Sequence, residues 1–324
     1  MSSSNPPPPQ CSSSSSPCLL SSLPQQSPYK FPTHRLKKTQ TDASKTPLVL
    51  VACGSFSPVT YLHLRMFEMA VDHVRQNTEF EVVGGYLSPV SDKYVKPGLL
   101  SSDHRVNMCN LATEETSSWL MVDPWEAFQA EYQRTAVVLD HFNHEINEVF
   151  GGVVTQDGEK RTVRIMLLAG SDLIATMSEP GVWAPEDLEH ILGRYGVFIV
   201  ERAGTDVAAA TDSLARWRHN IYLIPQMIHN DVSSTKVRLF LRRGLSVRYL
   251  MPACVIEYIE EHGLYLEEHE PRGRPPPEPT PPNPDANLNL NPHSTSIPIH
   301  QQQQQQPPTD RSQSIPFEES TTQS

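Results

Sequence analysis

Short apolar runs alternate with segments of helical spacing through the middle of the chain, and this alternation constrains the fold more than any other feature. Residues 48–52 read LVLVA, an apolar run with β-branched side chains that is typical of a strand buried on both faces. Leu62, Met66 and Met69 then recur at the spacing of one helix face. Strands that alternate with helices predict a parallel sheet covered on both sides. We therefore expect an α/β fold, a Rossmann-like doubly wound parallel sheet with helices on both faces.

The same pattern predicts about six strands. They are expected over residues 48–52, 80–86, 119–122, 164–169, 197–200 and 221–224. Further helices are expected to begin near residue 102, to cover residues 135–150, to open at residues 183–187, and to cover residues 234–243 and 253–262. In such sheets, ligands bind beyond the carboxyl ends of the strands. The polar clusters that follow the strands are therefore the candidate sites.

The two ends of the chain differ in composition from its middle. Of the 30 prolines, 21 lie in residues 1–46 and 271–324, and the second of these segments also contains six consecutive glutamines. Such segments bury too little apolar surface to offset chain entropy. We expect disordered tails over residues 1–46 and 268–324, around one domain over residues 47–267. A basic cluster at residues 34–38 is either a nuclear import signal or a solvated run.

Charge and cysteine content exclude several classes of protein. The net charge of −11 argues against electrostatic binding of nucleic acid or anionic lipid by the chain as a whole. The five cysteines are scattered and form no CxxC pair, which argues against a disulfide framework and a cysteine-rich zinc site. No apolar run approaches the ~20 residues that cross a bilayer, and the N-terminus does not have the pattern of a secretory signal. We expect a protein of the nucleus or the cytoplasm, or of both, with no nucleic-acid or membrane partner.

The loop after the first expected strand is the first candidate site. Residues 53–63 read CGSFSPVTYLH, in which Gly54 and Ser55 permit a close approach of the backbone to a ligand. The helix that follows offers free N–H groups, and His63 falls in its first turns, where the imidazole can donate to a phosphate oxygen. The spacing matches neither GxGxxG nor a GK[ST] loop. The alternative is a capping loop with a surface histidine.

Residues 230–238, which read NDVSSTKVR, form the second candidate site. They follow the sixth expected strand and open a helix. Three hydroxyls, the helix N–H groups, a lysine and an arginine converge at one end, a combination that suits a polyphosphate. The alternative is a serine N-cap on an ordinary helix with the basic residues exposed.

Three further candidates follow other strands. Residues 88–98 place lysines and a tyrosine in a loop, where the alternative is a solvated surface segment. Residues 170–172 suit contact with a ribose or a base, or else their aspartate caps a helix. Trp183, with Trp125 and Tyr132, can stack on a flat ring, or belongs to the core. All five candidate segments leave the carboxyl ends of expected strands.

Together these segments resemble the eukaryotic nicotinamide/nicotinate mononucleotide adenylyltransferases of the nucleotidyltransferase superfamily. Residues 54–63 resemble the (H/T)xxH motif, with Thr60 in place of the first histidine. Residues 233–238 are similar to the ISSTKxR motif, with Val232 where isoleucine is common. Further segments resemble the family in the same order, namely residues 88–90, 170–172, 201–204 and 248–250. The resemblance covers the expected domain and not the tails.

The resemblance implies transfer of the adenylyl group of ATP to nicotinamide or nicotinate mononucleotide, giving NAD or deamido-NAD and pyrophosphate. It also implies Mg²⁺, bound mainly through the substrate phosphates, and no covalent enzyme intermediate. His63 and Arg238 would be catalytic. The ATP-binding residues that it implies are Gly54, Ser55, Phe56, His63, Gly170, Asp172, Asn230, Ser233, Ser234, Thr235 and Arg238. The mononucleotide-binding residues that it implies are Ser55, Phe56, Lys96, Tyr132, Thr135, Trp183 and Arg202.

Two other interpretations stay open on the sequence. One is a related nucleotidyltransferase with a different phosphate acceptor, such as a phosphopantetheine or a choline-type phosphate. The other is a nucleotide-binding scaffold or chaperone without turnover. The sequence does not decide the preference between the two mononucleotides, and it allows a homo-oligomer.

Overall fold

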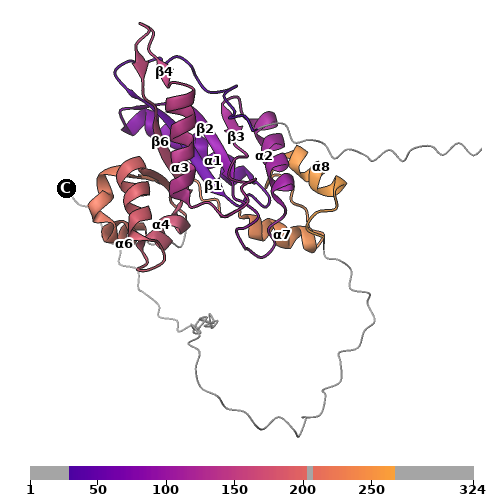
Figure 1. Ribbon diagram of the computed structural model, residues 1–324. Coiled ribbons are helices and arrows are strands. Elements are labelled where there is room, and N and C mark those ends of the chain that lie inside the picture. The colour runs from indigo at the N-terminus through magenta and orange to yellow at the C-terminus, as the bar shows by residue number, and fades with distance from the viewer. Residues whose placement is uncertain (1–28, 203–206, 267–324) are drawn as a thin grey trace, which may run out of the picture. The chain divides into compact units, whose positions relative to one another are not determined.

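The computed structural model describes residues 29–202 and 207–266, and a six-stranded sheet lies at its centre (Figure 1). The strands are β1 (Thr46–Gly54), β2 (Phe80–Pro89), β3 (Leu120–Val122), β6 (Arg164–Gly170), β7 (Val197–Val200) and β8 (Ile221–Ile224). Their order is β3-β2-β1-β6-β7-β8, and every neighbouring pair is parallel. The expected doubly wound parallel sheet of about six strands is confirmed.

Both faces of the sheet are covered, which is why its strands are apolar along their length. Along β1, Leu48 and Leu50 belong to one buried cluster and Val49 and Val51 to the other, and all four are fully buried. The first cluster includes side chains of α1 (Tyr61–Asn77), α2 (Ser102–Thr116), α7 (Ser234–Arg242) and α8 (Ala253–Glu261). The second includes side chains of α3 (Thr135–Asn143), α4 (Ser171–Ser178) and α6 (Val207–Ser213). The alternation of strand and helix in the sequence therefore places helices on both faces.

The helix expected over residues 135–150 has the predicted buried face but a different geometry. α3 continues as a π-helical turn (His144–Val149), and Val138, Phe142 and Ile146 are fully buried across both. A second π-helical turn (Glu189–Tyr195) continues the short α5 (Pro185–Leu188). The remaining short elements are a 3₁₀ turn (Ala215–Asn220) and the hairpin of β4 (Val153–Val154) and β5 (Lys160–Arg161).

Residues 29–45, which were expected to belong to a disordered tail, pack onto the domain. Phe31 and Leu36 are only 7% and 5% exposed and join the core. Arg35 donates to two backbone carbonyls and forms an ion pair of 2.7 Å with Glu114. The expectation of disorder is wrong for this segment, because a few anchoring side chains outweigh a polar average composition. The basic cluster that suggested an import signal is thereby partly packed against the domain.

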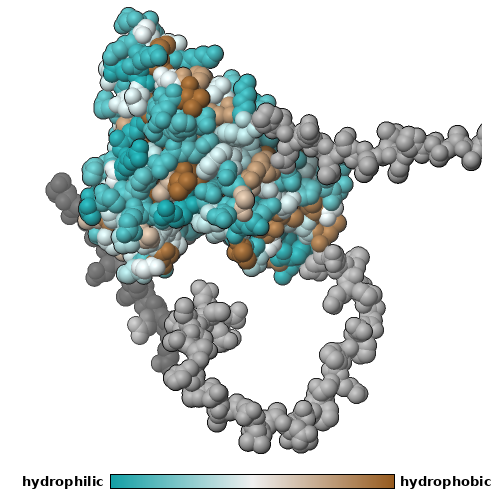
Figure 2. Space-filling view, in the orientation of Figure 1, coloured by the Kyte–Doolittle hydropathy of each residue, from teal (hydrophilic) through white to brown (hydrophobic). Residues whose placement is uncertain are grey.

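The other parts of the two expected tails, residues 1–28 and 267–324, lie outside the described residues. β1 begins at Thr46, one residue before the domain expected over residues 47–267, and the other strands of the sheet and the helices named above lie inside that range. In the part of the chain that the structure describes, no helix is long and apolar enough to span a bilayer. The face shown in Figure 2 is mainly hydrophilic, with small separate hydrophobic patches.

Candidate active site

The carboxyl ends of all six strands lie at one edge of the sheet, because every strand pair is parallel. The strand order reverses beside β1, whose neighbours are β2 on one side and β6 on the other. The loops that follow β1, β2, β6, β7 and β8 all begin at this edge. Four of the five predicted segments lie on one of these loops or on the helix that follows it. The aromatic residues are the exception, because Trp125 and Tyr132 follow β3 and Trp183 lies between α4 and α5.

The first loop has a tight backbone path that depends on Gly54. Phe56 has a left-handed backbone with φ of 41°. Its ring lies so close to Gly54 that a Cβ there would stand 3.1 Å from it. The same ring meets the imidazole of His63 edge-on, at 5.2 Å between the ring centroids. The glycine therefore lets Phe56 fold back onto the start of α1 and pack against the histidine.

The hydrogen bonds of His63 determine which of its ring nitrogens is free. The backbone N–H of Thr60 donates to Nδ1 over 3.0 Å, and the Thr60 hydroxyl lies 2.8 Å from the same nitrogen. A backbone N–H can only donate, so Nδ1 is an acceptor, and the neutral ring carries its proton on Nε2. Among the described residues, Nε2 has no hydrogen-bond partner. His63 thus caps α1 through one nitrogen and offers an N–H donor through the other.

Burial and two cations keep this imidazole neutral. Desolvation, together with the charges of Arg202 and Lys96, lowers the pKa of His63 to about 4. These three residues come from the loops after β7, after β2 and from α1, so the structure brings three predicted segments to one place. The local potential is positive around a neutral donor, which suits an anionic ligand.

The second motif joins directly onto the first loop. Ser234 Oγ donates to the carbonyl of Pro58 over 2.8 Å, and Arg238 donates to the carbonyl of Ser57 over 2.7 Å. Arg238 is only 7% exposed and also donates to the Thr235 hydroxyl over 3.3 Å. Arg238 therefore ties the two motifs together, a role that the sequence analysis did not assign to it.

The start of α7 has a serine N-cap with polar and charged side chains around it. Ser233 is the N-cap, and its hydroxyl accepts from the backbone N–H of Lys236 over 3.3 Å. The Lys236 ammonium pairs with Asp231. The Asn230 side-chain oxygen accepts from the backbone N–H of Val232 over 3.0 Å. The serine N-cap of the alternative is present, but its expectation of exposed basic residues is wrong for Arg238, which is buried. The link from Ser234 to Pro58 places the N–H end of α7 beside the first loop.

The predicted residues after β6 and β7 contact each other. Asp172 forms an ion pair of 2.8 Å with Arg202, and the Ser171 hydroxyl accepts from the backbone N–H of Arg202 over 3.1 Å. Gly170, the last residue of β6, is the N-cap of α4, so the alternative in which Asp172 caps that helix is wrong. The structure therefore pairs a residue predicted for the ATP side with one predicted for the mononucleotide side.

The predicted aromatic residues Tyr132 and Trp183 pack against different parts of the domain. Tyr132 stacks on Tyr94 with 5.8 Å between centroids, and it is 46% exposed. Thr135 is the first residue of α3, a few positions further along the chain. Trp183 is half-buried against the core, and its indole N–H donates to the Thr176 hydroxyl over 3.2 Å. No contact joins Trp183 to Tyr132 in the described part of the chain.

A buried carboxylate beside this edge was missed on the sequence. Glu126 is 2% exposed, and the Ser88 hydroxyl donates to it over 2.5 Å. Burial, with a further contribution from the charge of Asp123, raises the pKa of Glu126 to about 7. Nothing in the local sequence signalled a buried acid there, because its partner Ser88 is 38 residues away.

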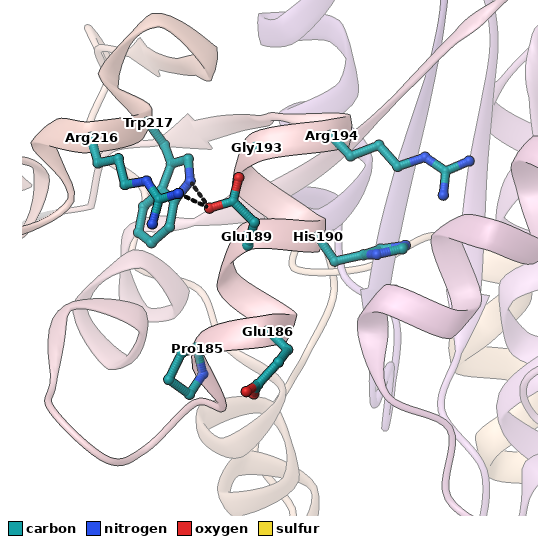
Figure 3. A pocket seen from close by; sticks show the side chains of 8 residues that line it. All are labelled: Pro185, Glu186, Glu189, His190, Gly193, Arg194, Arg216 and Trp217. Atoms are coloured by element: carbon teal, nitrogen blue, oxygen red, sulfur yellow. Dashed lines mark hydrogen bonds and ion pairs between the residues drawn. The ribbon is translucent and has the colours of Figure 1, made fainter.

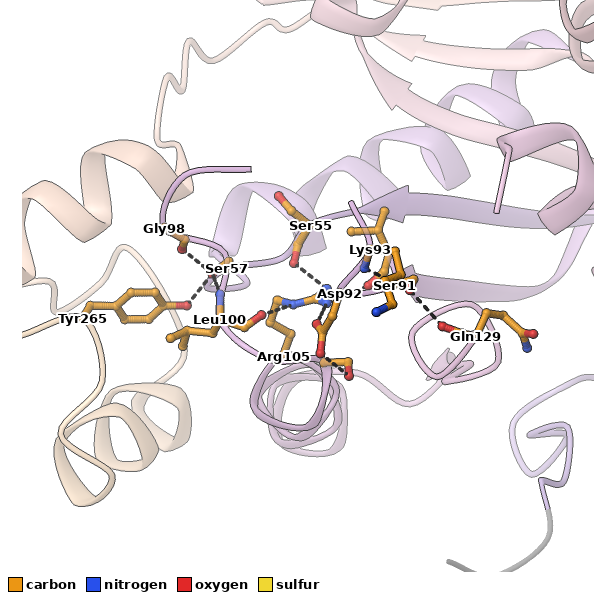
Figure 4. A network of polar contacts seen from close by, with 12 residues as sticks. Ser55, Ser57, Ser91, Asp92, Lys93, Gly98, Leu100, Arg105, Gln129 and Tyr265 are labelled. Atoms are coloured by element: carbon orange, nitrogen blue, oxygen red, sulfur yellow. Dashed lines mark hydrogen bonds and ion pairs between the residues drawn. The ribbon is translucent and has the colours of Figure 1, made fainter. Parts of the chain in front are cut away.

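Arg105 was also missed, although a signal was present. It lies on the stripe of α2 that carries the buried Cys109 and Ala112, at the spacing i, i+4 and i+7. A charge on an apolar stripe indicates a buried polar network. Figure 4 shows that network, in which Arg105 contacts the loops after β1 and β2.

No residues in the described ranges form a metal-binding cluster of three or more histidine, cysteine, aspartate or glutamate side chains. The polar groups at this edge are mainly hydroxyls, N–H groups and cations, with carboxylates that include Asp172 and the buried Glu126. Such a set fits a Mg²⁺ that arrives on phosphate oxygens and keeps several waters, as this ion prefers.

A separate surface hollow lies between α5, the second π-helical turn and the 3₁₀ turn (Figure 3). It is lined by Pro185, Glu186, Glu189, His190, Gly193, Arg194, Arg216 and Trp217. Glu189 accepts from the Trp217 indole N–H over 3.2 Å and pairs with Arg216 over 2.8 Å. None of the lining residues was a predicted site residue, and the polar groups at its centre satisfy one another.

Comparison with known proteins agrees with the geometry. The model of the cytidylyltransferase-like family matches residues 51–240. "Nicotinamide/nicotinic acid mononucleotide adenylyltransferase 2" of Saccharomyces cerevisiae is 62% identical over 246 residues, which are 75% of this chain and 62% of that protein. This chain thus spans about three fifths of the length of that relative.

Two relatives match over nearly their whole length. "Nicotinamide/nicotinic acid mononucleotide adenylyltransferase 1" of Bos taurus is 40% identical over 71% of this chain and 93% of its own length. The Arabidopsis thaliana enzyme named nicotinamide/nicotinic acid mononucleotide adenylyltransferase is 41% identical over 73% and 97%. These matches, with the family model, show that the chain belongs to the cytidylyltransferase-like family, in the branch of the nicotinamide/nicotinic acid mononucleotide adenylyltransferases.

Proposed function

We propose that this protein transfers the adenylyl group of ATP to nicotinamide mononucleotide, and to nicotinate mononucleotide, in NAD biosynthesis. A 5′-phosphate oxygen of the mononucleotide attacks the α-phosphorus of ATP. The bond from that phosphorus to the bridging oxygen breaks, and pyrophosphate leaves. The products are NAD or deamido-NAD. No covalent enzyme intermediate is needed, because the acceptor phosphate is itself the nucleophile.

One observation carries this proposal. A neutral imidazole with a free N–H lies beside two cations, at the edge where the loops of a doubly wound sheet converge. Donors of this kind stabilise negative charge that builds up in a transition state without having to reorganise. The names of the relatives, which are nicotinamide/nicotinic acid mononucleotide adenylyltransferases, support nucleotide chemistry in this chain.

On the ATP side, His63 Nε2–H donates to a phosphate oxygen as pyrophosphate departs. The N–H end of α7, with the hydroxyls of Ser233, Ser234 and Thr235, binds the triphosphate. Gly54, Ser55 and Phe56 pass their backbone along both nucleotides. Gly170 and Asp172 hold the ribose, Asn230 lies close to the phosphates, and Arg238 contacts them through the N–H groups that its links to Ser57 and Thr235 leave free. Mg²⁺ on the phosphate oxygens supplies charge neutralisation.

On the mononucleotide side, Lys96 and Arg202 neutralise the attacking phosphate. Trp183 stacks on the pyridine ring, Tyr132 adds a second aromatic surface, and Thr135 lies near the carboxamide. The support for Trp183 is its fixed orientation, since the indole N–H is already bonded to Thr176. Catalysis then consists of positioning and charge stabilisation.

The test uses the full chain with ATP, Mg²⁺ and each mononucleotide in turn, and it follows dinucleotide and pyrophosphate by chromatography. We expect the two products in equal amounts and none without the mononucleotide. The ratio of the two kcat/KM values measures the substrate preference. A folded chain that binds ATP and forms no dinucleotide from either acceptor would refute the proposal in favour of another phosphate acceptor or of a scaffold without turnover.

Partners and location follow from the same proposal. ATP and the mononucleotide are the ligands, and the acidic net charge of −11 supports the absence of nucleic-acid and membrane partners. A homo-oligomer and a place in the nucleus or the cytoplasm remain parts of the proposal, to be measured by light scattering and by imaging of the tagged chain.

A further inference from the structure

The guanidinium of Arg105 is the centre of a buried network between the site loops (Figure 4). Its side chain is 0% exposed. It donates to the carbonyl of Leu100 over 2.8 Å, of Ser55 over 3.2 Å and of Val90 over 2.7 Å. It also forms an ion pair of 2.8 Å with Asp92. A single side chain on α2 therefore contacts the loop after β1 and the loop after β2.

The partners of Arg105 lie at both ends of the segment that carries Lys96. Val90 and Asp92 are at its start and Leu100 is at its end. Residues 93–98 between these points are exposed, and Val95 is 95% exposed. Arg105 thus closes the base of a loop whose other contacts are few, such as the stacking of Tyr94 on Tyr132.

The first loop has other supports, so the two loops do not depend on Arg105 equally. The carbonyl of Ser57 accepts from Arg238 over 2.7 Å, and the Ser57 hydroxyl lies 2.9 Å from the hydroxyl of Tyr265. The segment after β2 also has contacts of its own, since Ser57 Oγ donates to the carbonyl of Gly98 over 3.1 Å. The Ser102 hydroxyl, just past the end of that segment, also donates to Asp92 over 3.0 Å. Among the described residues, however, only Arg105 joins both Val90 and Asp92 to Leu100.

We propose that Arg105 is a positioning residue that holds the Lys96 loop against the first loop, so that the mononucleotide phosphate meets ATP in reacting geometry. This inference rests on the proposed function. Arg105 does not itself touch the reacting atoms. A lysine at this position cannot replace it, because one ammonium does not reproduce a planar fork that reaches three carbonyls and a carboxylate.

The test compares Arg105→Lys and Asp92→Asn with the wild type. Asp72→Asn is the matched control, because Asp72 forms an exposed ion pair of 2.9 Å with Arg75 on α1, outside the site. We expect KM for the mononucleotide to rise and kcat to fall, so that kcat/KM drops on the order of tenfold to a hundredfold in Arg105→Lys. The Kd for ATP alone is expected to change less than about threefold, since the first loop keeps its other supports.

Two further readouts separate positioning from a general loss of fold. Guanidinium ion at low millimolar concentration is expected to restore part of the mononucleotide kcat/KM in Arg105→Ala and none in Asp72→Asn. Trypsin is expected to cleave after Lys93 several times faster in Arg105→Lys than in the wild type, whether or not substrate is present; the bond after Lys96 resists trypsin because Pro97 follows it. Far-UV circular dichroism checks that each variant is folded. If Arg105→Ala does not fold, Asp92→Asn still tests the network.

The outcomes are distinguishable. No dinucleotide from the wild type would refute the proposed function, and the trypsin assay would still decide whether Arg105 holds the loop. Wild-type turnover with unchanged kinetics in Arg105→Lys and Asp92→Asn would overturn the positioning role alone. Equal shifts in ATP Kd and mononucleotide KM would also overturn it, because they would indicate collapse of the whole site.

Discussion

Replacing His63 by asparagine separates the two roles of this side chain, which are to cap α1 through Nδ1 and to offer a hydrogen-bond donor through Nε2. Thr60 contacts Nδ1 through its N–H at 3.0 Å and its hydroxyl at 2.8 Å, and Nε2–H has no hydrogen-bond partner among the described residues. The asparagine Oδ1 stands close to the place of Nδ1, so His63→Asn keeps the acceptor that caps α1 and removes the Nε2–H donor. His63→Ala removes both.

The expected sizes follow from these bonds. Loss of one donor to a developing oxyanion costs about 2.7–4 kcal/mol, or a factor of about 10²–10³ in kcat. We expect both variants to lose this factor with little change in KM. His63→Ala is also expected to lose about 1 kcal/mol of stability with its cap, whereas His63→Asn keeps most of it.

Steady-state kinetics and chemical denaturation measure the two effects separately. The pKa of about 4 means that about one ring in a thousand is protonated at pH 7. The kcat profile of the wild type should therefore show no inflection near pH 6.5 from this group. Such an inflection that disappears in His63→Asn, or a His63→Asn kcat above a tenth of the wild-type value, would refute the neutral-donor mechanism.

Three predictions concern the rest of the domain. Deleting residues 1–28 should leave Tm unchanged, because it removes none of the contacts described. Deleting residues 1–40 should lower the free energy of unfolding by several kcal/mol, because it removes the buried side chains of Phe31 and Leu36. Calorimetry on both truncations checks this. The raised pKa of Glu126 means that the folded state binds this proton more tightly than the unfolded state. This group should therefore make the free energy of unfolding fall as the pH rises from the ordinary pKa of a glutamate to about 7. Chemical denaturation of Glu126→Gln should show a flatter pH dependence of stability, and an unchanged slope would contradict the assignment. Gly85→Ala would place a Cβ 2.5 Å from the Trp119 ring and should cost about 1–3 kcal/mol in urea unfolding, so a neutral result would contradict the packing.

The strands and the covering helices could be predicted because each depends on local spacing. The run at residues 48–52 is apolar on both sides of the pleat, which indicates burial on two faces without any knowledge of its neighbours. The lengths of helices were less predictable, as the π-helical turn after α3 shows. Its wider turn still keeps the buried side chains on the sheet, so the periodicity alone could not reveal it.

The packing of residues 29–45 could not be predicted, because its partners are distant in the chain. Leu36 is buried by the sheet, and Arg35 reaches backbone carbonyls of residues 113 and 120. Composition over a window averages these anchors with their polar neighbours. A short segment of this kind is ordered by the surface on which it lies, and that surface forms only after the sheet does.

The sequence by itself determined the parallel α/β class, the two motifs and the end of the sheet where they meet, since periodicity and order along the chain are local properties. The tertiary structure alone decided the state of the site. It placed Thr60 against Nδ1 of His63, buried the ring where Arg202 and Lys96 also favour its neutral form, and set Arg105 between two loops. Tautomer, pKa and loop position depend on groups that only folding brings within a few ångströms, where desolvation and charge act strongly.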